Sequence, residues 1–199
     1  MREPLPLATV HEAVLDFLRG RDDVVVFGAT AVNAYVAEPR MTQDIDLMSP
    51  RAAELAEQLR AYLNERLDVG VRVIGEGKGY RISQVREAGN RHLVDIRSGT
   101  TLTASRRIED VSVASPAELI ATKVACCYSR RGRPKSFSDR RDLAVLLLQF
   151  PDLKTETGAV QQTLKSLGVS EEVLNSWGEL VREEIRRPDE YEKFYCFVG

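Results

Sequence analysis

The 199-residue sequence lacks the features that mark several large protein classes. It has no charge excess, because 28 Lys and Arg against 30 Asp and Glu give a formal net charge of −2. This balance excludes a dedicated basic nucleic-acid coat and an acidic disordered tail. The longest purely apolar run, residues 143–148, falls far short of the ~20 residues that span a bilayer, and no secretory signal pattern opens the chain. We therefore expect a cytoplasmic protein with no membrane partner.

Cysteine and histidine are also scarce. Three cysteines, two of them adjacent at Cys126 and Cys127, make a poor disulfide framework. With His11 and His92 the two histidines and no C-x-x-C spacing, a zinc site built from soft ligands is not expected. The chain contains neither G-x-S-x-G nor H-E-x-x-H, which argues against a serine hydrolase or a zinc protease.

The hydrophobic pattern predicts an α/β protein with two lobes. A mixed sheet with flanking helices is expected in residues 1–114, and a helical lobe in residues 115–199, where Ser115-Pro116 opens a run of helical patterns. Helices are predicted at 9–19, 29–38, 50–67, 116–130, 139–150, 156–167 and 171–186, with Thr9 and Glu12 as a capping box and Ser49-Pro50 as a helix start. Strands are predicted at 24–27 and 44–48 and, by period-two alternation within 71–114, around 71–73, 80–82, 93–96 and 111–113.

The Gly28-Ala29-Thr30 segment lies between a predicted strand and a predicted helix. Backbone N–H groups at such a helix start can point at an anion, and glycine lets a phosphate approach. The alternative is a tight turn that needs glycine for its backbone alone. By contrast, Gly75 to Gly79 joins two period-two segments and opens no helix, so we interpret it as a hairpin turn.

Two aspartates, Asp44 and Asp46, flank Ile45 in a predicted strand. Because side chains alternate along a strand, both carboxylates project from one face. Like charges at this spacing raise each other's pKa unless a cation lies between them, and Mg²⁺ is the natural cation for oxygen ligands. The alternative is an exposed strand face with two solvated acids.

A third acid, Asp95, alternates with the apolar residues Val94 and Ile96. An aspartate in such a strand needs a partner. If the two strands are neighbours, three carboxylates form a cage for two divalent ions, as in enzymes that displace pyrophosphate from a nucleotide. The alternative for Asp95 is a salt bridge to Arg97 or Arg81.

A basic segment, residues 129–135, contains Arg130, Arg131, Arg133 and Lys135. On a chain with no overall positive charge, it could attract a triphosphate or the backbone of an RNA acceptor. The alternative is a solvated loop between two helices.

The motif Gly28-Ala29-Thr30-Ala31 followed by Arg40-x-Thr42-x-Asp44-Ile45-Asp46 resembles the nucleotidyltransferase superfamily with the polymerase-beta-like fold. The likeness is greater to toxin nucleotidyltransferases of the AbiEii/MenT type. In the second lobe, Ala121-Thr122-Lys123 and Asp139-Arg140-Arg141-Asp142-Leu143 match that group's lysine and acid-rich segments, so the resemblance covers about residues 24–148. One departure is Ala29, where the superfamily usually has Gly or Ser, so the hydroxyl at this position is missing.

The resemblance implies a role for each matching residue. Asp44 and Asp46 would bind Mg²⁺ or Mn²⁺, and Asp95 would complete the second metal and assist deprotonation of the acceptor. Lys123 would face the triphosphate, where an ammonium neutralises charge on the leaving pyrophosphate. Asp139 or Asp142 would orient Lys123 or contact the nucleotide. The implied nucleotide-binding set is Gly28, Ala29, Thr30, Arg40, Thr42, Lys123, Asp139 and Asp142.

Structural alternatives exist for the second-lobe residues too. Lys123 could lie along an amphipathic helix with its amine in solvent, and the two aspartates could simply stabilise the start of a helix.

The expected activity is transfer of a nucleoside monophosphate from an NTP to a hydroxyl with release of pyrophosphate, and the resemblance implies a tRNA 3′ end or a protein as the acceptor. Toxin behaviour with a cognate antitoxin follows from the resemblance alone. Two alternatives are an inactive nucleotidyltransferase-like binding or regulatory module, which the Gly28-Ala29 loop favours, and an enzyme that modifies a small molecule.

Overall fold

The computed structural model describes residues 5–87 and 89–186, and the contacts divide the chain into an N-terminal unit, residues 1–115, and a C-terminal unit, residues 116–199. The two units are described separately below. The predicted boundary after residue 114 lies next to this division.

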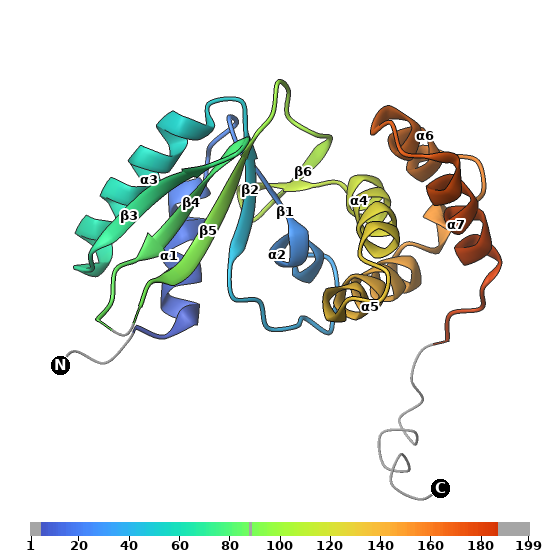
Figure 1. Ribbon diagram of the computed structural model, residues 1–199, viewed down its shortest axis with the longest axis horizontal. Coiled ribbons are helices and arrows are strands. Elements are labelled where there is room, and N and C mark those ends of the chain that lie inside the picture. Colours follow the sequence, from blue (N-terminus) through green and yellow to red (C-terminus); the bar gives the residue numbers. More distant parts are fainter. Residues whose placement is uncertain (1–4, 88, 187–199) are drawn as a thin grey trace, which may run out of the picture. The chain divides into compact units, whose positions relative to one another are not determined.

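The N-terminal unit is built on a mixed β-sheet, shown in Figure 1. In the described residues its strands are β1 (Val25–Phe27), β2 (Ile45–Ser49), β3 (Val71–Glu76), β4 (Gly79–Gln84), β5 (Arg91–Ser98), β6 (Ser105–Ile108) and β7 (Val111–Ala114). They lie in the order β3-β4-β5-β2-β1-β7-β6. The β2/β5 and β1/β7 pairs are parallel, and the other pairs are antiparallel. The predicted α/β class with a mixed sheet is therefore confirmed.

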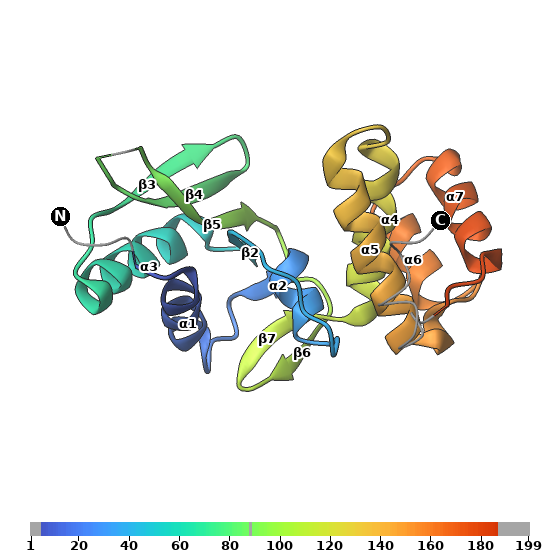
Figure 2. The ribbon, with the colours of Figure 1, turned by 90° about the horizontal axis from the view of Figure 1, so that it is seen from below.

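Helices α1 (Leu7–Leu18) and α3 (Ala52–Leu67) pack together against one face of this sheet, as Figures 1 and 2 show. The apolar stripe of α3, which includes Leu55, Leu59 and Leu63, is fully buried. The stripe recurs every fourth residue, the spacing that keeps side chains on one helix face.

Alternation in β2 decides which side chains join this core. Ile45 and Leu47 are fully buried, whereas Asp46 between them and Met48 after Leu47 are partly exposed. The acidic side chain of β2 therefore projects from the face opposite to the one that holds Ile45 and Leu47.

The C-terminal unit is helical in its described part. It contains α4 (Pro116–Ser129), α5 (Pro134–Gln149), the short 3₁₀ helix η1 (Pro151–Leu153), α6 (Ala159–Ser166) and α7 (Glu171–Arg182). Ile120, Leu146, Leu164 and Trp177 lie in its core. The indole of Trp177 donates a hydrogen bond to the Thr155 carbonyl at 3.2 Å, so its polar atom is satisfied.

Two predicted capping sites do not start their helices. Helix α1 begins at Leu7, where the Pro6 carbonyl accepts a hydrogen bond from Val10 N–H, so Thr9 lies inside the helix and caps nothing. Helix α3 begins at Ala52 rather than Pro50. Ser49 remains in β2, and its hydroxyl accepts from Arg51 N–H at 3.0 Å, which turns the chain before the helix starts.

Other boundaries differ for local reasons. Helix α2 (Gly28–Asn33) ends before the predicted Glu38, because the Asn33 amide bonds both the N–H and the carbonyl of Arg40. Helix α5 begins at Pro134, five residues before Asp139, with proline in its first turn. Strand β6 was not predicted, since its exposed sequence Ser-Arg-Arg-Ile lacks apolar alternation; charged side chains are usual on an edge strand.

Within the described part of the chain, no helix has the length and apolar character needed to cross a membrane.

Candidate functional site

Three acidic residues of the N-terminal unit converge where β2 and β5 run side by side. The parallel register pairs Asp46 directly with Asp95, so their side chains leave the sheet on the same face. Asp44 precedes β2 by one residue. Ligand atoms of Asp44, His92 and Asp95 all lie within 4.8 Å of one another. The structure thus brings Asp44 and Asp95 together, with Asp46 in register beside Asp95.

His92 belongs to this cluster, and the sequence prediction missed it. Strict alternation would place His92 on the face opposite to Asp95, but the β4/β5 register shifts between Ile82 and Ser83, so that Leu93 is the extra residue of a bulge. The trace in the sequence is that two apolar residues, Leu93 and Val94, are adjacent and so break the alternation, and in the structure both are buried. The bulge turns His92 to the Asp95 side.

Both ring nitrogens of His92 face carboxylates. Nε2 lies 3.0 Å from Asp95 Oδ1, and Nδ1 lies 3.4 Å from Asp44 Oδ2. All three side chains are about three-tenths exposed, so the cluster is open to solvent. Two carboxylates and an imidazole at this spacing are donors that fit a divalent cation such as Mg²⁺ or Mn²⁺.

The salt-bridge alternative for Asp95 is correct in one respect. Arg81 on β4 lies opposite Asp95, and its Nε donates to Asp95 Oδ1 at 3.1 Å. The guanidinium of Arg97 instead stacks over the Phe27 ring at 4.8 Å. Arg81 thereby holds one carboxylate oxygen of Asp95, and Asp95 still lies in the cluster with Asp44 and His92.

Gly28 marks the closest approach between the β1-α2 turn and the acidic strand. It has φ +68°, and a Cβ at this position would lie 2.0 Å from Asp46 Oδ2 and 3.0 Å from Asp46 Cβ. Glycine is required twice here, by its backbone conformation and by the neighbouring carboxylate. The following Ala29 is buried, and Thr30 Oγ1 is buried without a hydrogen-bond partner among the described residues.

The loop before β2 supports Asp44. The Thr42 hydroxyl donates to the Asp44 carbonyl at 3.0 Å, and the backbone of Arg40 is held by Asn33. His11 also lies near this loop: burial lowers its pKa, an effect that a backbone hydrogen bond at Gln43 and the charge of Asp44 partly offset.

The C-terminal unit contains the other predicted residues in a buried charge cluster. Lys123 Nζ on α4 donates to Asp139 Oδ1 at 3.0 Å and to Asp142 Oδ2 at 2.7 Å on α5. The side chain of Lys123 is only 7% exposed and that of Asp142 is fully buried. The alternative of a lysine with its amine in solvent is therefore wrong. Arg130 also bonds Asp139, at 2.7 Å.

Lys123 stays charged in this setting. Burial alone lowers the pKa of Lys123, but hydrogen bonds and charges from Asp142 and Asp139 outweigh it and raise the pKa above its usual value. A buried ammonium with two carboxylates is a stable arrangement only while all partners are present.

Two arginines of the basic segment make contacts within the C-terminal unit. Arg130 is bound to Asp139, and Arg131 lies over the Tyr128 ring at 4.6 Å. Arg133 and Lys135 are exposed, as is Phe137 in the first turn of α5, with 74% of its surface accessible.

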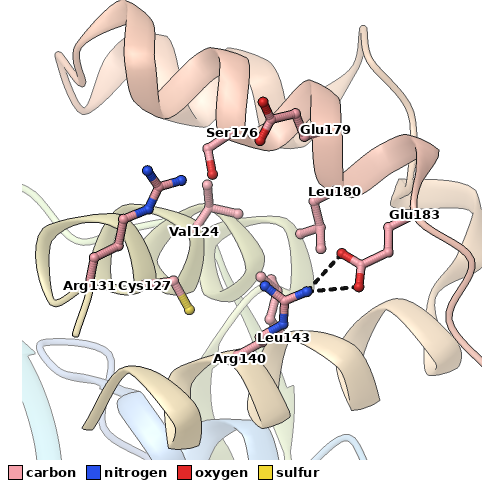
Figure 3. A pocket seen from close by; sticks show the side chains of 9 residues that line it. All are labelled: Val124, Cys127, Arg131, Arg140, Leu143, Ser176, Glu179, Leu180 and Glu183. Atoms are coloured by element: carbon pink, nitrogen blue, oxygen red, sulfur yellow. Dashed lines mark hydrogen bonds and ion pairs between the residues drawn. The ribbon is translucent and has the colours of Figure 1, made fainter. Parts of the chain in front are cut away.

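A small pocket between α4, α5 and α7 is a weaker candidate, shown in Figure 3. Its volume is about 110 Å³, below the ~300 Å³ at which small-molecule sites begin. Arg140 in its wall is paired with Glu183 at 2.7 Å. Burial raises the pKa of the Cys127 thiol to about 11, so the thiol is protonated at neutral pH and is no nucleophile.

Comparison with known proteins agrees with these features. Residues 13–194 match the family model described as the nucleotidyl transferase AbiEii toxin of a type IV toxin–antitoxin system. No curated protein matches the chain in a sequence search.

Solved structures with a similar fold include three nucleotidyltransferases. The Megavirus polyadenylate synthase aligns with a TM-score of 0.58 and 18% identity over 73% of this chain, which covers 32% of the viral protein. A putative nucleotidyltransferase from H. pylori aligns at 0.55 and 14% over 88% of this chain and 92% of its own. The enzyme ANT(2")-Ia, solved with adenylyl-2"-tobramycin, aligns at 0.53 and 16% over 82% and 97%. At these identities the likeness establishes the fold.

Gly28→Ala tests the close approach to Asp46. We expect it to destabilise the protein by several kcal/mol, since the new methyl overlaps Asp46 in addition to the ~1–2 kcal/mol of a left-handed backbone. Gly77→Ala is the matched control, because Gly77 has φ +54° and open space around its Cβ position, so it carries the backbone cost alone. Chemical denaturation measures both, and equal losses would contradict the contact.

Lys123→Met tests the buried charge cluster. Removal of the ammonium takes away the cation that the buried Asp139 and Asp142 share, which we expect to cost ~3–5 kcal/mol of unfolding free energy. Lys165→Met, at an exposed position of α6, should change it by less than ~0.5 kcal/mol. Thermal and urea unfolding give the values, and a Lys123→Met protein as stable as the wild type would show that the cluster does not hold the fold together.

Proposed function

Because the chain belongs to the AbiEii family of nucleotidyltransferases, we propose that it transfers a nucleoside monophosphate from an NTP to a hydroxyl of an RNA, with a tRNA 3′ end as the acceptor. The observation that carries the proposal is the parallel pairing of β2 and β5, which places Asp46 beside Asp95 and Asp44 close by. Mg²⁺ or Mn²⁺ is the cation proposed for these carboxylates.

In the proposed reaction, an acceptor hydroxyl oxygen attacks the α-phosphorus of the NTP. A bond forms between that oxygen and the phosphorus, the bond from the α-phosphorus to the bridging oxygen of the β-phosphate breaks, and pyrophosphate leaves. A divalent cation, when bound, stabilises the negative charge that develops on the transferring phosphate.

The chain's own residues have distinct parts in this scheme. Asp44 and Asp46 hold the cation, and Thr42 fixes the backbone that presents Asp44. Asp95 accepts the proton of the attacking hydroxyl, and Arg81 holds its carboxylate in place through a hydrogen bond. Gly28 leaves room for Asp46.

The prediction that Lys123 neutralises charge on the leaving pyrophosphate stays a prediction. In the structure its ammonium is buried and bound to Asp139 and Asp142, where it links α4 to α5 within the C-terminal unit. The family also suggests a cognate antitoxin as partner.

RNA is favoured over a protein acceptor by the surface of the basic segment. Arg133 and Lys135 are exposed, and Phe137 presents an aromatic ring to solvent close to them in sequence. Exposed cations bind a phosphate backbone, and an exposed ring stacks on unpaired bases, which are present at a tRNA 3′ end.

A transfer assay tests the activity. The wild type with Mg²⁺, each α-labelled NTP and total tRNA or a cell lysate should label RNA, whereas chelation of the cation should abolish labelling. Asp46→Asn and Asp95→Asn should each lower the rate by ~10²-fold or more, and Asp22→Asn, an exposed carboxylate of the same unit, should leave it unchanged. Label in protein instead would replace the RNA acceptor, and no label with either acceptor would refute the proposed reaction.

Binding of an RNA without any NTP tests the acceptor surface. Phe137→Ala should weaken binding of a single-stranded oligonucleotide by ~1–3 kcal/mol, the value of one stacked base. The double change Arg133→Gln, Lys135→Gln should flatten the salt dependence by about one unit of slope per lost phosphate contact. Leu167→Ala removes another exposed apolar side chain of the same unit and serves as the control. Equal affinity of Phe137→Ala and the wild type would exclude stacking on this ring.

A further inference from the structure

We propose that His92 is itself a metal ligand of the Asp44, His92 and Asp95 cluster, and that its imidazole shifts the preference of the site from Mg²⁺ toward Mn²⁺. The inference rests on the proposed metal-dependent function. It adds a nitrogen donor to a site for which the sequence offered only carboxylates.

The two contacts of the imidazole differ in kind. The 3.0 Å distance from Nε2 to Asp95 Oδ1 is that of a hydrogen bond, whereas the 3.4 Å from Nδ1 to Asp44 Oδ2 is longer than a charge-assisted one. A neutral imidazole has one N–H. With that proton on Nε2, which is directed at Asp95, Nδ1 offers a lone pair on the side of Asp44.

At 3.4 Å from each other, Nδ1 and Asp44 Oδ2 are placed so that both can act as donors to one divalent cation. The hydrogen bond from Nε2–H to Asp95 is the contact that metal-binding histidines make with their second nitrogen, and it fixes both the tautomer and the ring orientation. Arg81 in turn holds the same Asp95 oxygen. The ring is therefore positioned before any cation arrives.

The β5 bulge supports a role for this side chain beyond packing. Leu93 and Val94 fill the core on consecutive positions, and the cost is an irregular ladder opposite Ile82 and Ser83. The result of that irregularity is to bring a partly exposed imidazole onto the face with Asp46 and Asp95. Bulges next to active sites commonly re-aim one side chain in this way.

The chemistry of the donor atoms predicts which cation the site binds more tightly. Mg²⁺ strongly prefers oxygen and keeps its water, whereas first-row transition ions accept imidazole readily. A set that mixes carboxylate oxygens with an imidazole nitrogen therefore suits Mn²⁺ better than Mg²⁺, while a set of carboxylates alone does not discriminate in this way.

The experiment uses the full chain with Mn²⁺ alone and needs no turnover. Pulsed electron paramagnetic resonance detects the ¹⁴N nucleus of an imidazole bound to Mn²⁺, and this chain has two histidines. We expect the ¹⁴N signal in the wild type and in His11→Gln, the matched control, which also lies near Asp44, and its loss in His92→Gln.

Equilibrium binding provides a second readout. His92→Gln, which replaces the nitrogen with an amide oxygen, should weaken Mn²⁺ binding on the order of tenfold or more and Mg²⁺ binding by clearly less, so the ratio of the two constants falls. Histidine labelled with ¹⁵N in the wild-type protein must change the same signal, which tests the ligation even if the variant does not fold.

The outcomes separate this inference from the proposed function. Mn²⁺ bound to the wild type with no ¹⁴N signal, or a signal lost in His11→Gln instead, overturns the role of His92 and leaves a carboxylate metal site intact. Failure of the wild type to bind Mn²⁺ or Mg²⁺ overturns both. An unchanged ratio of binding constants in His92→Gln overturns the claim about preference.

Discussion

The candidate site depends on a single pairing, the parallel contact between β2 and β5. Asp46 and Asp95 are direct neighbours in that ladder, so two like charges share one side of the sheet. Such an arrangement is unfavourable in itself. Arg81 and His92 beside Asp95 make it tolerable. The divalent cation that we propose for this site would add further compensation.

Much of the fold was predictable because its core follows simple periodicity. The apolar run at β1, the alternation around Ile45 and Leu47, and the stripe of α3 all follow the spacing of their elements. Helix starts were less predictable: Thr9 and Ser49 have capping chemistry, yet Pro6 and Arg51 occupy the cap positions. Strand β6 carries no apolar signal, because it is exposed at a sheet edge.

In the site itself, Asp44, Asp46 and Asp95 were accessible to the sequence, since alternation and motif spacing both single them out. His92 was not, because its orientation depends on a bulge that arises between two strands rather than within one. The burial of Lys123 was equally hidden: it requires Asp139 and Asp142, one turn apart on α5, to meet a residue of α4. The orientation of His92 and the burial of Lys123 both depend on how two elements pair, which the local sequence pattern does not show.

The absence of a side chain at Gly28 has a consequence for the history of the chain. Its backbone turn and the second aspartate of the acidic strand occupy adjoining volumes with no spare room between them. Neither residue can change independently of the other. A larger residue at Gly28 would displace the Asp46 carboxylate, so such a substitution is tolerated only in a protein in which Asp46 has already been replaced. Among related sequences, a glycine at the position of Gly28 should therefore occur together with an aspartate at the position of Asp46.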